Sequence, residues 1–246
     1  MMTAEFTTLC RYLKGANIMA EKAKKKYSPL RVLLAVIIAI LAIIIIVLII
    51  VFFPRAKIEN VPSLEKTGAK SLVVYFSRDK VIATDGVDAT SSASLNINGR
   101  EYVGDVTDAA EKVAKATGSD IYQIYTERYY PQSYGGTAMR AFVEEKLNMR
   151  PDLANIPDDL DGYDVIYVGY PIWWFNAPMP VGTFLESYDL NGKTIVPFCT
   201  AATDSIDETM PFIREVCKGA DVKDGLTATN KSYEEIEKWL KDNGLV

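Results

Sequence analysis

The residues best suited to chemistry lie in one aromatic loop, within the segment YDVIYVGYPIWWFNAPMP at residues 163–180. A short apolar strand runs into a glycine, and the chain then places Trp173, Trp174 and Phe175 between two prolines. Open α/β sheets bind ligands just outside the carboxyl ends of their strands. Three aromatic side chains at that position predict a flat apolar wall for a planar ring, and stacking there adds about 0.5–1.5 kcal/mol beyond area burial. The alternative is that the tryptophans only cover the core.

The rest of the composition excludes several classes of chemistry. The chain has no histidine, which removes imidazole bases, histidine metal ligands and Ser-His-Asp catalysis. Its three cysteines, Cys10, Cys199 and Cys217, show neither a C-x-x-C motif nor a metal-binding spacing, so we expect no metal site and no disulfide framework. From residue 71 onward, 16 basic and 28 acidic side chains give a net charge of −12, and nucleic acid is therefore not an expected partner.

The elements that position the loop can be read from hydrophobic periodicity. Apolar runs that alternate with helical patterns predict βαβ units and a parallel sheet. We expect strands near residues 71–76, 121–125, 164–169, 194–199 and 224–228. We expect helices near residues 107–117, 137–147, 179–188, 207–217 and 233–242, the last capped by Ser232. After the first strand, two short runs flank Asn98-Gly99, a pair suited to a two-residue turn, and predict an antiparallel hairpin.

A single apolar segment precedes this pattern. Residues 32–53 are 22 consecutive uncharged positions, which as a helix would be about 33 Å long, enough to cross a hydrocarbon core of about 30 Å. No A-x-A cleavage site follows, so an uncleaved anchor is expected rather than a signal peptide. Seven basic residues before the segment and four after it predict a cytoplasmic amino terminus and an extracytoplasmic domain. Translation could also start at Met19, which would leave five basic residues before the segment and weaken this prediction.

The predicted organisation therefore has four parts. These are a basic amino-terminal tail at residues 1–29, a transmembrane helix at 30–53, a linker at 54–70 that holds the domain off the bilayer, and an α/β domain at 71–246. Residues 30–53 would place the lipid bilayer among the partners.

The aromatic loop resembles the flavodoxin-like family, in its branch with a YPIWW-x-x-AP loop. SLVVYFSR at 71–78, GSDIYQI at 118–124 and KTIVPFCT at 193–200 resemble that family's first, second and fourth strands. The resemblance implies a flavodoxin-like doubly wound sheet of five parallel strands in the order 2-1-3-4-5, with a hairpin insertion after strand 1 and, here, one transmembrane helix before it. It also implies a non-covalent FMN at the strand ends and redox chemistry on its ring.

The same resemblance implies which side chains would contact FMN, and it assigns no catalytic residue. The phosphate would be held by residues that follow the first strand and begin the next helix, namely Ser77, Arg78, Gly104 and Thr107. The ring would be held by residues from two further loops, namely Pro171, Ile172, Trp173, Trp174, Phe175, Asn176, Ala177, Thr200, Ala201 and Asp204.

Two of these loops depart from the family's pattern. Asp105 and Val106 replace the last two residues of a G-N-T element, and an ionised Asp105 at about 6 Å would repel a phosphate by roughly 3 kcal/mol unless Arg78 offsets it or Asp105 points away. TAATDSID at 200–207 replaces a glycine- and serine-rich run. Asp204 in that run either tunes the ring's potential or caps the next helix.

The expected function is that of a membrane-anchored FMN protein which carries electrons to a redox partner protein or a small-molecule acceptor. One alternative is an NAD(P)H-dependent FMN quinone or flavin reductase. The other is a flavodoxin-like module that has lost FMN and serves as a binding domain, which the changes at residues 104–106 and 200–205 favour.

Overall fold

The structure is a computed structural model that describes residues 28–52, 57–58, 60–77, 96–98, 101–103, 105–131 and 133–246. The chain divides into two compact units, residues 1–51 and 52–246, and each is described by itself. The first contains the apolar helix α2 (Pro29–Phe52), whose described side chains are all exposed. This helix is long and apolar enough to cross a membrane, a property that transmembrane spans share with signal sequences.

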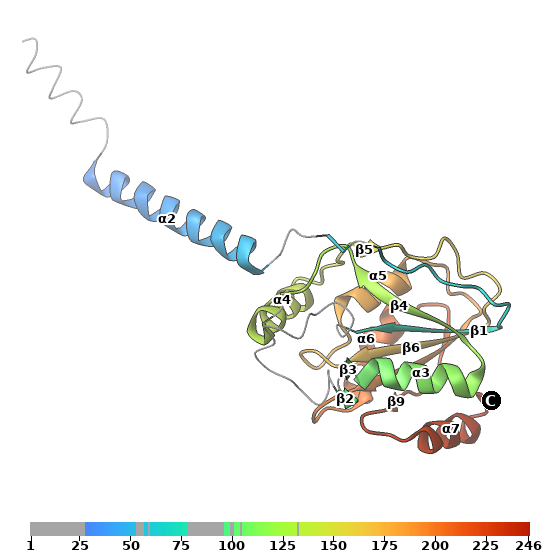
Figure 1. Ribbon diagram of the computed structural model, residues 1–246. Coiled ribbons are helices and arrows are strands. Elements are labelled where there is room, and N and C mark those ends of the chain that lie inside the picture. Colours follow the sequence, from blue (N-terminus) through green and yellow to red (C-terminus); the bar gives the residue numbers. More distant parts are fainter. Residues whose placement is uncertain are drawn as a thin grey trace, which may run out of the picture. The chain divides into compact units, whose positions relative to one another are not determined.

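The second unit is built on a seven-stranded, mostly parallel sheet (Figure 1). Four long strands lie side by side in the order β4 (Asp120–Thr126), β1 (Ser71–Phe76), β6 (Val165–Pro171) and β7 (Thr194–Thr200). Both faces of these strands are covered, which explains why they read as continuous apolar runs. The expected order of the first four strands is thus present.

The two edges of the sheet differ from the sequence prediction. The expected fifth strand is divided into β8 (Asp221–Val222) and β9 (Leu226–Thr227), which each pair with β7 in parallel. At the other edge, β5 (Leu153–Ala154) pairs with β4 in the antiparallel direction. Strands of two residues carry too little periodicity to be predicted, so the five-stranded, all-parallel sheet was incomplete as a description.

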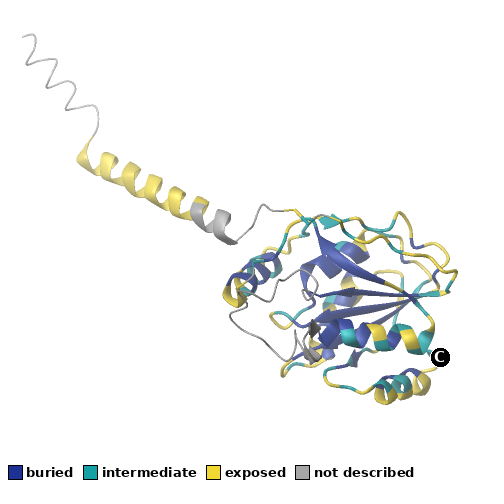
Figure 2. Cartoon of the chain, in the orientation of Figure 1, coloured by how far each residue is buried: buried dark blue, intermediate teal, exposed yellow. Residues whose placement is uncertain are grey.

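Helices cover both faces of the sheet (Figure 2). In β1, Val73 and Tyr75 belong to one core cluster with residues of α3 (Asp105–Thr117) and α7 (Tyr233–Asp242). Their neighbours in the strand, Leu72 and Val74, belong to the opposite core cluster with α5 (Met179–Glu186) and α6 (Met210–Val216). The alternation of side chains along a strand therefore divides β1 between two hydrophobic layers.

The helix termini largely follow their capping residues. Ser232 caps α7 in a capping box with Glu235, as the sequence predicted. α4 (Tyr134–Lys146) begins three residues earlier than expected because the Ser133 side chain accepts a hydrogen bond from the Gly136 backbone N–H. α6 begins later than expected, because a short 3₁₀ helix, η2 (Ile206–Glu208), precedes it.

The expected hairpin insertion is present as β2 (Asn96–Asn98) and β3 (Glu101–Val103). Asn98 pairs with Glu101, so the connection comprises residues 99–100, one position later than the predicted Asn98-Gly99 turn. The rest of the insertion lies outside the described residues.

The segment predicted as a linker is held against the domain from Lys57 onward. Lys57 forms a β-bridge with Arg128, and the Ile58 backbone N–H donates to the Glu127 carbonyl at 3.0 Å. Farther along, the Thr67 backbone N–H and hydroxyl both donate to the Asp120 carboxylate at the start of β4. These residues form a strap along the outer edge of the sheet, from the carboxyl end of β4 to its amino end.

Candidate functional site

Three loops leave the sheet at one edge, because the strands before them run parallel. Ser77 follows β1, residues 171–177 end and follow β6, and residues 200–204 end and follow β7. The chain passes from β1 to β4 on one side, whereas β6 lies on the other side of β1. The topological switch point therefore lies between β1 and β6, where doubly wound sheets bind ligands.

The aromatic loop is a tight and strained turn. The Trp173 backbone N–H donates to the Asn176 carbonyl at 2.9 Å, and the Asn176 N–H donates back to the Trp173 carbonyl at 3.0 Å. The two residues between them have left-handed backbone conformations, with φ of 52° at Trp174 and 64° at Phe175. Glycine or asparagine usually fills such positions, and bulky residues there cost on the order of 1–3 kcal/mol each. Strain of this kind is typical of functional loops.

The two indoles lie against different partners. Trp173 is half-buried and packs edge-to-face on Phe76 and Tyr130, with ring centroids 5.4 and 5.3 Å away. Trp174 turns toward α4, where its Nε1–H donates to the Ala138 carbonyl at 2.8 Å. The predicted flat wall of paired indoles is therefore wrong, because the turn between Trp173 and Asn176 directs consecutive side chains apart.

The loop leaves one ring without a comparable support. Phe175 is 64% exposed, more than any other aromatic side chain among the described residues with a large exposed surface. The Asn176 side chain accepts a hydrogen bond from the Ala177 backbone N–H at 2.8 Å, which fixes the return of the chain into α5. Pro171, Ile172 and Ala177 are buried at the base of the loop.

A buried ion pair contacts Tyr130, the ring on which Trp173 packs. Arg140 and Glu144, one turn apart on α4, have side chains only 6% and 2% exposed, and their Nε and Oε1 atoms lie 2.7 Å apart. Glu144 also accepts a hydrogen bond from the Tyr130 hydroxyl, and the Arg140 guanidinium stacks 3.9 Å from the Tyr130 ring centroid. Burial raises the pKa of Glu144, while Arg140 opposes that rise.

Sequence reasoning missed this network. Its available signals were the i,i+4 spacing of Arg140 and Glu144 and the paired tyrosines before the helix, and neither indicates burial.

The loop after β7 is closed by hydrogen bonds to neighbouring segments. The Ile172 N–H donates to the buried Thr200 carbonyl at 2.9 Å, which links the two ring-side loops. The Ala201 N–H donates to Thr229 Oγ1 at 2.8 Å. Ser205, not Asp204, caps the following η2 helix, so the capping role considered for Asp204 is wrong.

The amino terminus of α3 lies at the same edge, because α3 connects β1 to β4. Asp105 is its first residue, and the Asp105 Oδ2 and the Thr107 hydroxyl are buried without hydrogen-bond partners among the described residues. Burial first, and the nearby Asp108 second, raise the pKa of Asp105 from 3.8 to about 6. The first-turn N–H groups and the unbonded Thr107 hydroxyl fit a phosphate, whereas an ionised Asp105 opposes one. Arg78 and Gly104 lie outside the described residues.

Two cysteines in the domain are not placed for chemistry. Burial raises the pKa of Cys199 and of Cys217 to about 12, so neither is a ready thiolate at neutral pH. In the part of the chain that the structure describes, no cluster of three or more acidic or cysteine side chains could hold a metal ion.

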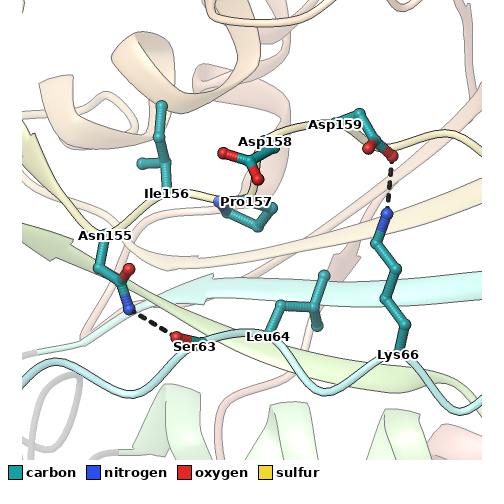
Figure 3. A pocket seen from close by; sticks show the side chains of 8 residues that line it. All are labelled: Ser63, Leu64, Lys66, Asn155, Ile156, Pro157, Asp158 and Asp159. Atoms are coloured by element: carbon teal, nitrogen blue, oxygen red, sulfur yellow. Dashed lines mark hydrogen bonds and ion pairs between the residues drawn. The ribbon is translucent and has the colours of Figure 1, made fainter.

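A separate cleft of about 290 Å³ lies between the strap and the residues after β5 (Figure 3). An ion pair between Lys66 and Asp159, at 2.7 Å, and a hydrogen bond from Asn155 to Ser63 cross it. These contacts fasten the strap to the domain, and the cleft is not part of the loops at the carboxyl edge.

Comparison with known proteins agrees with this geometry. The flavodoxin family profile matches residues 101–243. A solved flavoprotein from Bacteroides uniformis is 31% identical, with a TM-score of 0.55, and the match covers 71% of this chain and 99% of that one. A second, from Bacteroides eggerthii, is 28% identical with a TM-score of 0.58, covering 72% and 99%.

A flavoprotein from Lactobacillus acidophilus, solved in complex with FMN, is 19% identical with a TM-score of 0.49, covering 70% of this chain and 98% of that one. A search of curated proteins finds no match. From the family match and the Bacteroides uniformis relative, we conclude that the chain belongs to the flavodoxin family.

Proposed function

We propose that the protein is a membrane-anchored, FMN-binding flavodoxin that carries electrons for a redox partner protein or a small-molecule acceptor. Family membership and the strained aromatic loop at the switch point both support this function. The observation that carries it is the Thr107 hydroxyl, which is 1% exposed, lies in the first turn of α3, and has no hydrogen-bond partner in the part of the chain that the structure describes. A buried hydroxyl of this kind requires a partner, and a phosphate at a helix amino terminus would provide it.

Different parts of the chain would bind the phosphate and the ring of the cofactor. Thr107 and the amino terminus of α3 would bind the phosphate, and residues 171–177 and 200–204 would border the ring. When bound, FMN supplies reversible electron transfer at its ring, while the protein sets access and orientation. The contacts of Trp173 with Tyr130 and of Trp174 with Ala138 keep the loop in one shape before the ligand arrives.

One observation favours the alternative of a flavodoxin-like module without FMN. The Asp105 carboxyl is buried beside the same helix terminus, and its ionised form would repel a phosphate dianion. The raised pKa of Asp105 reduces this conflict only below about pH 6.

An FMN titration of the full chain in detergent distinguishes the two functions. Protein that is yellow as purified, or that quenches FMN fluorescence on titration, supports FMN binding, and colourless protein that does neither overturns it. Thr107→Val should weaken FMN binding by roughly ten- to a hundredfold, because a hydrogen bond to a charged group contributes about 1.5–3 kcal/mol. Thr117→Val is the matched control, since that hydroxyl lies at the other end of α3 and already donates to the Val113 carbonyl at 2.8 Å.

The membrane part of the proposal rests on α2 and on the charges around it. We expect the full chain to resist alkaline carbonate extraction from membranes, which a cleaved or soluble form would not. External protease added to spheroplasts should digest the domain if it is extracytoplasmic, and protection would reverse the proposed orientation.

A further inference from the structure

The point at which the anchor joins the domain is fixed by backbone pairing. Lys57 bridges Arg128, and Arg128 lies just beyond β4, which ends at Thr126. The chain from α2 therefore meets the domain at the carboxyl edge of the sheet, the edge that also carries the aromatic turn and the start of α3.

The chain between α2 and Lys57 is short compared with the size of the domain. Four residues, 53–56, separate the end of α2 from Lys57. Five residue steps of at most about 3.6 Å span no more than about 18 Å, whatever path the chain takes. A compact domain of this size has a radius of gyration of about 16 Å and is therefore about 40 Å across. If α2 spans a bilayer, the edge at Lys57 must remain near the bilayer surface.

Helix α4 lies beside this junction, because the Arg140 guanidinium donates to the Tyr129 carbonyl at 2.7 Å, next to Arg128. Most of the exposed large apolar side chains in the described part of the domain lie on α4, directly after it, or on the turn that packs against it, namely Tyr134, Met139, Leu147, Met149, Trp174 and Phe175. The others, Ile121 and Val246, lie elsewhere. We call these six residues the α4 face. The hydrogen bond from Trp174 to the α4 backbone and its ring contact with Phe142 join the turn to the helix.

The composition of the α4 face fits a lipid headgroup region. Tryptophan and tyrosine are enriched at membrane interfaces, where an apolar ring body and a polar tip are both accommodated. Charge contributes little here, because Lys57 pairs with Glu127 and Lys146 pairs with Glu145. Apolar burial of about 25 cal/mol per Å² would therefore dominate, and docking should depend weakly on salt.

We propose that the α4 face docks on the headgroup region of the membrane that α2 crosses, so that the crevice between β1 and β6 opens toward lipid. This inference rests on the proposed membrane anchoring. The occupant is the bilayer surface, because only residues 53–56 separate α2 from Lys57 and the α4 face lies on the same part of the domain as Lys57.

Site-directed spin labelling of the full chain in phosphatidylcholine nanodiscs tests this docking. In a Cys10→Ser background, a nitroxide is attached through Met139→Cys on the α4 face or through Ile121→Cys at the amino end of β4. Cys199 and Cys217 are buried with raised pKa values and should remain unlabelled. Power saturation then compares oxygen, which concentrates in lipid, with a nickel chelate, which stays in water.

The docking predicts that the label at residue 139 is several-fold more accessible to oxygen than to the chelate, and that the label at residue 121 shows the reverse. A label at residue 139 that behaves like the one at 121 overturns the docking and leaves the anchor intact. Low accessibility to both reagents at residue 139 indicates a protein partner and also overturns it. A chain that does not co-purify with the discs overturns the anchor and the docking together, and the flavin spectrum of the same sample reports separately on FMN.

Discussion

Asp105→Asn is the sharpest test of the electrostatics at the start of α3. Asp105 is only 7% exposed, and burial raises its pKa from 3.8 to about 6, with Asp108 adding to the rise and Lys112 opposing it. The folded protein thus binds this proton more tightly than the unfolded chain does. The stability linked to that proton is fully present below about pH 3.8 and is lost as the pH rises through about 6.

The size of the effect follows from the shift. About two pKa units correspond to about 3 kcal/mol at most, at 1.36 kcal/mol per unit. Asparagine has nearly the same shape and no charge, so the variant should lack this pH dependence. At pH 8 its free energy of unfolding should exceed that of the natural chain by about 1–3 kcal/mol, and at pH 4 the two should nearly coincide.

The same substitution should also increase the affinity for FMN. Removing a negative charge near a phosphate dianion should raise the affinity about tenfold or more at pH 8, and less at pH 5, where Asp105 is already protonated. Urea unfolding from pH 4 to 8 and FMN fluorescence titration measure the two effects. Glu111→Gln is the control, because its carboxylate is exposed on the same helix and is not among the groups that shift the pKa of Asp105. Equal pH profiles for Asp105→Asn and the natural chain would refute the reasoning.

Three further outcomes are expected. Arg140→Ala should lower the free energy of urea unfolding by about 3–5 kcal/mol, because Glu144 would remain buried without its partner; a loss below about 1 kcal/mol would contradict a buried pair. Phe175→Gly should raise the free energy of unfolding of flavin-free protein, measured by thermal melting, by about 1 kcal/mol, because glycine accepts a φ of 64° without strain. A decrease would show that the ring packs in the free protein. Cys199 and Cys217 should resist iodoacetamide at pH 8 until the domain unfolds, as followed by mass spectrometry, and rapid labelling of folded protein would contradict their raised pKa values.

The long elements could be predicted because each carries its own signal. β1 is an uninterrupted apolar run with helices on both faces, and Ser232 with Glu235 forms a capping box that is visible in the sequence. The strap could not be predicted, because its contacts join residues far apart in the chain, as between Thr67 and Asp120. Local hydrophobic periodicity does not indicate contacts between residues so far apart in the sequence.

The candidate site was predictable in position but not in shape. An aromatic loop after an apolar strand indicates a carboxyl-edge site, and the structure places residues 171–177 there. The directions of Trp173 and Trp174, however, depend on two positive φ angles and on α4, which sequence reasoning treated as an ordinary covering helix. The buried partners Arg140 and Glu144 were hidden for a related reason, since charged residues at i,i+4 usually pair in solvent.

The features of the candidate site that sequence reasoning missed occur around the carboxyl edge. A turn with two bulky residues at positive φ is unfavourable by itself, and it persists because Trp173 packs on Tyr130 and Trp174 bonds to α4. Folding gains little from Phe175, which projects into solvent at the end of that turn. Retaining a strained, exposed ring therefore calls for a contact outside the chain, and either the proposed FMN at this edge or the proposed docking on the membrane would provide it.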